Sequence, residues 1–167
     1  MSEWKDLAHF LYGQGFWYAD PIREIEGLGE EQLFWTPGPN ALCMLWQVGH
    51  IAHREQTHLG GFLQGPHGTM VPEAYEVFGP DWCSTERVRA SIDSVQGVLA
   101  WVRGVRDKSH AYIASLTPDD FHTVPPASEG DLSVAHWVFI TVAHTASHVG
   151  RIQLLRALLL GQRERAC

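Results

Sequence analysis

The sequence has little of the residue types that mark disulfide-rich and thiolate-metal proteins. Its 167 residues include three cysteines, Cys43, Cys83 and Cys167, and no two of them form a Cys-x-x-Cys pair. An odd number of isolated cysteines argues against a disulfide framework and against a thiolate zinc site. The simplest setting for such a chain is a reducing compartment, so we expect a cytoplasmic protein.

Charged residues are also scarce, at 19%, and 12 basic residues against 19 acidic ones give a formal net charge of −7. Binding to nucleic-acid phosphates requires a basic surface, so we expect no nucleic-acid partner. No window approaches about eighteen consecutive apolar residues, so we expect no membrane-spanning helix. Residues 1–20 lack the apolar region of a secretory signal. With 45% hydrophobic residues, the chain is predicted to form one globular domain over residues 1–167.

The sequence does contain long stretches of helical periodicity, whereas the alternation typical of strands is absent. Four helices are predicted: 2–28 with a break near Asp20, 41–64 after a cap at Asn40, 84–116 after a cap at Ser84, and Asp131 or Ser133 to Leu160, ended by Gly161. The connection over 65–82 is rich in Gly and Pro yet too apolar for a solvated linker, so we expect it to be functional or to pack as a lid. Together these elements predict an all-α, four-helix bundle with a long connection between helices 2 and 3.

Ten histidines are unusual in a chain with so few charges. His144 and His148 stand four residues apart on the apolar stripe of the fourth helix, so both imidazoles can reach one ion. His50 on the second helix would complete a set of three, and three protein nitrogens with an open position are typical of a catalytic zinc site. His53, three residues further on, competes with His50 for this role. Imidazole also suits nickel, copper and iron, so the pattern does not fix the metal.

Each of these patterns also has a structural explanation, in which buried histidines form hydrogen bonds across helices. Six other histidines are expected at the surface, at helix ends or in loops: His9, His58, His67, His110, His122 and His136. Several enzyme classes are excluded because their motifs are missing. The segment 144–148 lacks the glutamate of the zinc-protease motif, the fourth helix lacks the acidic residues of a di-iron site, and there is no nucleotide-binding loop.

Three segments together resemble the DinB/YfiT-like superfamily of small bundle metalloproteins. They are 30–40, 47–55 (QVGHIAHRE) and 144–152 (HTASHVGRI), in the order and spacing of that family. The resemblance implies that His50, His144 and His148 bind a divalent metal ion and leave one coordination position open. Zinc is the first choice, with nickel, iron or manganese as alternatives. The resemblance also implies a homodimer.

Characterised members of this family include S-transferases and isomerases that use low-molecular-weight thiols. The resemblance therefore implies a metal-dependent enzyme of the thiol-transferase or hydrolase type, with a small-molecule substrate. Arg151 stands where the family commonly has glutamine, and we expect its guanidinium to hold a carboxylate of the substrate. His53 is expected to act as a general base, or to form a hydrogen bond to one of the metal-binding residues without binding the ion itself. Tyr12 and Tyr18 are weaker options for the base.

Two alternatives stay open. The bundle could be a non-catalytic, metal- or small-ligand-binding stress-response protein, or a structural member that only dimerises. In the first case tryptophans would surround the pocket, among them Trp17, Trp46, Trp101 and Trp137. Core packing is the competing explanation for most of these aromatic residues.

Overall fold

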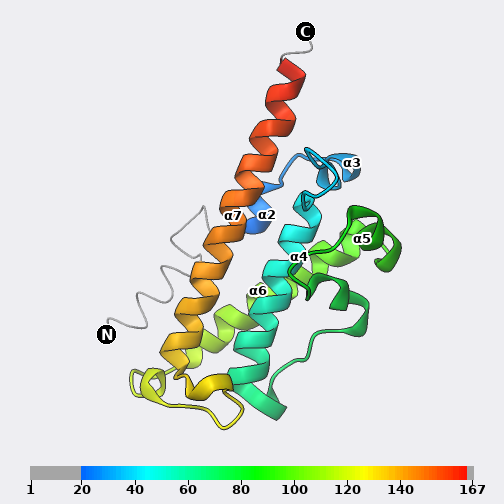
Figure 1. Ribbon diagram of the computed structural model, residues 1–167. Coiled ribbons are helices and arrows are strands. Elements are labelled where there is room, and N and C mark those ends of the chain that lie inside the picture. Colours follow the sequence, from blue (N-terminus) through cyan, green and yellow to red (C-terminus); the bar gives the residue numbers. More distant parts are fainter. Residues whose placement is uncertain (1–19, 165–167) are drawn as a thin grey trace.

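The computed structural model describes residues 20–164, and this part of the chain is helical, without a strand (Figure 1). The all-α class is therefore confirmed. Most of the first predicted helix, residues 2–19, lies outside the described residues, so the four-helix bundle stays a prediction. No helix among residues 20–164 is long and apolar enough to cross a bilayer.

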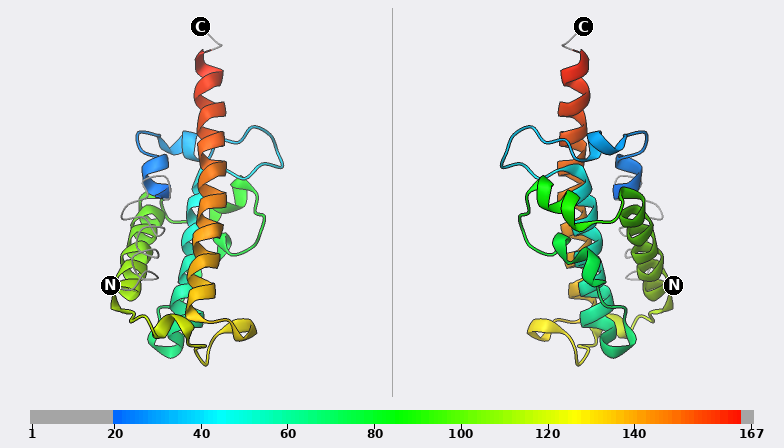
Figure 2. Two further views of the ribbon diagram at one scale, coloured as in Figure 1. Left: turned by 90° about the vertical axis from the view of Figure 1, so that its left-hand side faces the viewer. Right: turned by 90° about the vertical axis from the view of Figure 1, so that its right-hand side faces the viewer.

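Three long helical segments form the frame of the described part. They are α4 (Met44–Glu55), which continues into the π-helix η3 (Gln56–Phe62), α6 (Val95–Ser115) and α7 (Val134–Glu164). Helix α4 packs against both α6 and α7. A buried ion pair in which Arg106 donates to Glu55 at 2.9 Å joins α6 to α4. Figure 2 shows that the C-terminal end of α7 projects beyond the other helices.

The remaining elements are short. They are α2 (Pro21–Glu24), α3 (Glu30–Leu33), α5 (Thr85–Ser91) and the 3₁₀ helices η4 (Gly65–His67), η5 (Glu73–Phe78), η6 (Asp120–His122) and η7 (Glu129–Asp131). At the predicted break, Asp20 lies outside α2 and its side chain accepts a hydrogen bond from the Ile22 amide at 3.0 Å. Pro21 opens this helix, at a position where a missing N–H costs nothing.

Three predicted helix boundaries are wrong. The first helix was predicted to reach Leu28, but α2 ends at Glu24. The second helix begins at Met44 instead of Ala41, and its N-cap is Cys43 instead of Asn40, because the chain stays extended at Cys43 and carries this side chain into the core before the helix starts. The fourth helix continues through Gly161 to Glu164. Gly161 does not adopt the positive φ of a left-handed helix cap, so it does not end the helix.

The third predicted helix is in fact two helices. Ile92 has an extended backbone, and the Ser94 hydroxyl accepts a hydrogen bond from the Gly97 amide at 3.0 Å. This bond caps α6, so the chain starts a new helix where the periodicity suggested continuation. Ser84 caps α5 as predicted, by accepting from the Arg87 amide at 3.2 Å.

The connection over residues 65–82 contacts α4 through the 3₁₀ helix η5, whereas Met70 and Trp82 of the same connection are exposed. Its 3₁₀ helix η5 ends in Phe78, which is fully buried. Phe78 lies directly against Gly49 of α4, where a Cβ atom would stand 2.4 Å from the phenyl ring. A glycine at this position therefore lets the connection approach the α4 backbone next to His50.

Candidate metal centre

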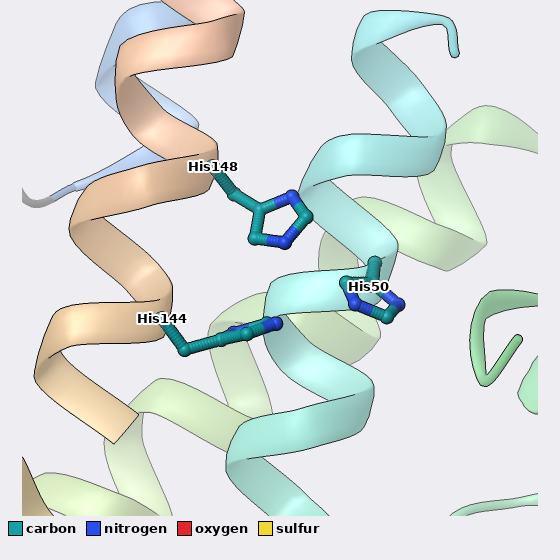
Figure 3. A group of neighbouring side chains, drawn as sticks. All are labelled: His50, His144 and His148. Atoms are coloured by element: carbon teal, nitrogen blue, oxygen red, sulfur yellow. The ribbon is translucent and has the colours of Figure 1, made fainter. Parts of the chain in front are cut away.

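Three imidazoles from two helices meet where α4 and α7 pack together (Figure 3). His50 comes from α4, and His144 and His148 come from successive turns of α7. Each ring offers one nitrogen, and these three atoms all lie within 4.8 Å of one another. Two nitrogens bound to one ion at about 2.1 Å are at most about 4.2 Å apart, so a small ring movement closes the set around an ion.

Hydrogen bonds behind two of the rings determine which nitrogen is free. His50 Nδ1 donates to the carbonyl oxygen of Phe78 at 2.6 Å, and His148 Nδ1 donates to Oε1 of Gln47 at 2.5 Å. Both partners are acceptors, so each Nδ1 carries the proton. The lone pair is then on Nε2, which is the arrangement that orients a histidine as a metal ligand.

The third ring, His144, differs from the other two. Nδ1 of His144 is buried and has no hydrogen-bond partner among the described residues. No hydrogen bond to a described residue therefore fixes the tautomer of this ring, and either nitrogen is able to carry the lone pair that binds an ion. Three imidazole nitrogens suit zinc, nickel, copper or iron, whereas manganese prefers oxygen ligands. The residues present therefore fit an imidazole-binding metal ion.

Burial keeps the three imidazoles neutral. Desolvation is the main cause that lowers the pKa of His50 and of His148 to about 4. Desolvation, followed by the proximity of His148, lowers the pKa of His144 to about 3. A neutral imidazole need not lose a proton before it binds a metal ion, so the set is ready to coordinate.

A cavity of about 480 Å³ opens beside the three rings, and its wall also includes Arg54, His58, Asp81 and Arg151. The Arg54 guanidinium donates to the Gly79 carbonyl at 3.0 Å and to the Asp81 carboxylate at 3.1 Å. Arg151 makes no hydrogen bond or ion pair with another described residue. The cavity thus contains one positive charge that is not compensated by the described part of the chain, which suits an anionic ligand.

A family model described as the DinB superfamily matches residues 22–152. The chain belongs to the DinB superfamily. The match includes all three histidines of the cluster and Arg151. A search of curated proteins and a search of solved structures find no match.

His58 also lines this cavity of the DinB chain, although the sequence predicted it to lie at the surface, at a helix end or in a loop. It is 8% exposed, its Nδ1 lies 3.1 Å from Thr141 Oγ1, and burial lowers its pKa to about 4. In a regular α-helix, His58 would be rotated about 80° from His50. The wider π-helix η3 turns less per residue and brings His58 closer to that face. The sequence did contain a sign of this placement, because His50, Arg54 and His58 follow one another at intervals of four residues.

His53 of this DinB chain lies outside the three-histidine cluster. Its Nε2 is 3.3 Å from Oε2 of Glu76, and its ring lines a second, mostly apolar cavity of about 500 Å³. Of the two histidines that competed for the ligand role, His50 is the one in the cluster. The role of His53 as a base stays a prediction, and Tyr12 and Tyr18 lie outside the described residues.

The described tryptophans do not surround the DinB cavity. Trp46 stacks on His50 with 4.4 Å between ring centroids, and it is itself buried in the core. Trp101 donates to Gln56 Oε1 at 2.9 Å, and Trp137 donates to Ser128 Oγ at 2.9 Å. None of these three lines the cavity beside the histidine cluster, and Trp17 lies outside the described residues.

Proposed function

We propose that this chain is a metal-dependent enzyme in which His50, His144 and His148 hold a divalent ion. The reaction is a thiol S-transfer or a hydrolysis on a small substrate. One observation carries the proposal: three neutral imidazoles from α4 and α7 converge on the wall of a cavity, and two of them are oriented from behind by hydrogen bonds. The known thiol chemistry of characterised family members supports the S-transfer option.

A divalent ion at this position would supply a nucleophile near neutral pH, by lowering the pKa of water or of a thiol. Neither of the two cysteines among the described residues fills this role. Cys43 is buried at the start of α4, and desolvation raises the pKa of its thiol. Cys83 is buried in the same hydrophobic core, and neither residue lines the cavity.

Arg151 is proposed to hold the anionic part of the substrate. Its guanidinium is exposed on the cavity wall and makes no bond to another described residue, whereas Arg54 is already engaged by Asp81 and Gly79. A guanidinium can bind a carboxylate through two parallel hydrogen bonds, which fixes both position and orientation. His53 is kept as a proposed general base or as an outer partner of a metal ligand. Its Nε2 lies 3.3 Å from Glu76 Oε2, and its ring lines the second cavity.

Metal analysis of the untagged protein tests the proposal. The wild-type chain is expected to bind one zinc equivalent, and His144→Ala should lose stoichiometric binding because one of three ligands is gone. His122→Ala is the control, since His122 is exposed and distant from the cluster in the chain. Full metal content in His144→Ala would show that the ligand assignment is wrong.

Turnover separates the enzyme from the non-catalytic alternative. The metal-loaded protein should react with at least one member of a panel that pairs small thiols with electrophiles and also includes ester and amide substrates. Metal bound at full stoichiometry with no turnover on the whole panel would favour a metal- or ligand-binding protein instead.

A further inference from the structure

We propose that His58 is a substrate-orienting residue whose Nε2 accepts a hydrogen bond from an O–H, N–H or S–H group of the molecule in the three-histidine cavity. The location of that molecule rests on the proposed function. The orientation of His58 rests on its own hydrogen bonds and contacts.

A chain of hydrogen bonds fixes the proton of the His58 ring. The Thr141 hydroxyl donates its single proton to the Trp137 carbonyl at 2.8 Å. Thr141 Oγ1 can therefore only accept from His58 Nδ1, which lies 3.1 Å away. The proton of the neutral ring is thus on Nδ1, and Nε2 is left as an acceptor.

The position of the ring makes this acceptor available to a ligand. His58 lines the cavity together with the three histidines, and no hydrogen bond joins its Nε2 to another described residue. The ring packs against Trp137, with 4.8 Å between centroids, and against Phe62, with 6.0 Å. These contacts hold the imidazole in one orientation before anything binds, which limits the entropy lost on binding.

The other polar side chains of the cavity make this acceptor distinctive. Arg54 and Arg151 only donate hydrogen bonds. The Asp81 carboxylate accepts from Arg54 and is 95% exposed to water, so His58 is the buried acceptor of the cavity wall outside the three-histidine cluster. His58 is anchored at Thr141, whereas Arg151 lies about 15 Å further along α7 at 1.5 Å per residue. The cavity therefore offers an acceptor at one end of the histidine cluster and a cation at the other. It fits a substrate with a hydrogen-bond donor at one end and an anionic group at the other.

The tautomer of His58 is measurable without any metal. Long-range ¹H–¹⁵N correlation spectra of the full-length, metal-free protein labelled with ¹⁵N-histidine should show Nδ1 protonated and Nε2 bare at pH 7. Thr141→Val removes the anchor without altering the cavity wall and should shift the ring towards the other tautomer. A wild-type ring with its proton on Nε2 would overturn the proposal.

Two thiol probes that differ by one hydroxyl test the acceptor itself. Cobalt-loaded protein is titrated with 2-mercaptoethanol and with ethanethiol, followed by the visible spectrum of the ion. A net hydrogen bond predicts roughly 2- to 12-fold tighter binding of 2-mercaptoethanol. His58→Phe should abolish this preference, and Thr141→Val should reduce it. The control His122→Phe, at an exposed histidine, should retain it.

The outcomes separate this proposal from the proposed function. Equal affinity of the cobalt-loaded wild type for the two thiols would refute the proposed role of His58 and leave the proposed metal site untouched. Failure of the wild-type protein to bind cobalt at all would instead count against the metal site.

Discussion

At the scale of single residues, the ligand histidines depend on partners that hold them from behind. Gln47 and His148 lie on different helices, and their hydrogen bond spans α4 and α7. The Phe78 carbonyl does the same for His50 from a third element, η5. Such outer partners fix the tautomer and the direction of the free nitrogen, so they contribute to metal affinity without touching the ion.

Gln47→Leu should weaken zinc binding by about 10- to 100-fold, because it removes the acceptor that orients His148. Competition with a chromophoric chelator measures this change. Gln96→Leu is a matched control on the exposed face of α6 and should leave the affinity unchanged. Equal zinc affinity in Gln47→Leu and in the wild type would show that the hydrogen bond does not support the site.

Arg151→Gln should weaken the binding of inorganic phosphate to the zinc-loaded protein about tenfold, since a charged hydrogen-bond donor is lost. Isothermal titration at low ionic strength gives the dissociation constant. Arg103→Gln is the control, because it removes an equal charge at an exposed position of α6, and it should bind phosphate as the wild type does. If both variants lose affinity to the same small extent, only the overall charge of the protein is responsible.

At the scale of elements, the sequence predicted that α4 and α7 exist, because both carry apolar residues at helical spacing, but it placed the start of α4 and the end of α7 wrongly. It did not predict the break between α5 and α6, where a single side-chain bond from Ser94 begins a new helix. It also missed the π-helix η3, since one wider turn leaves almost no trace in an apolar periodicity. That turn explains why His58 was expected outside the site and is found in the cavity.

Gly49→Ala tests how η5 approaches α4. The new Cβ would stand 2.4 Å from the Phe78 ring, so we expect a loss of about 1–3 kcal/mol in the free energy of unfolding and weaker zinc binding through His50. Urea unfolding and chelator competition measure the two effects. At Gly104 of α6 a Cβ meets no described atom within 4 Å, so Gly104→Ala should stabilise the helix by up to about 1 kcal/mol. Unchanged stability in Gly49→Ala would contradict the proposed close packing.

At the scale of the whole molecule, the C-terminal end of α7 projects beyond the other helices (Figure 2). Apolar side chains are exposed on the C-terminal half of this helix. Leu154 is 60% exposed, and Leu158, one turn further on, is 40% exposed. Their spacing of four places them on one side of the helix. The homodimer implied by the family resemblance stays a prediction, and this surface is where we propose to test it.

Light scattering after gel filtration is expected to find a dimer of the wild-type chain and a monomer of the double variant Leu154→Lys, Leu158→Lys, because two buried lysines would disrupt an apolar interface. Met70→Lys, at a side chain that is 74% exposed, is the control and should remain dimeric. A dimer that survives the double substitution would place the interface on another surface.

The sequence by itself determined the helical class, the pair of histidines four residues apart on α7, and the glycine beside His50, because these depend on local periodicity and on the volume of one side chain. Only the tertiary structure decided that the Phe78 carbonyl orients His50, that the Gln47 side-chain amide orients His148, and that His58 lines the cavity. Those contacts connect residues 28, 83 and 101 positions apart. Contacts at such separations depend on how the helices are rotated and packed against one another, which a local pattern does not specify.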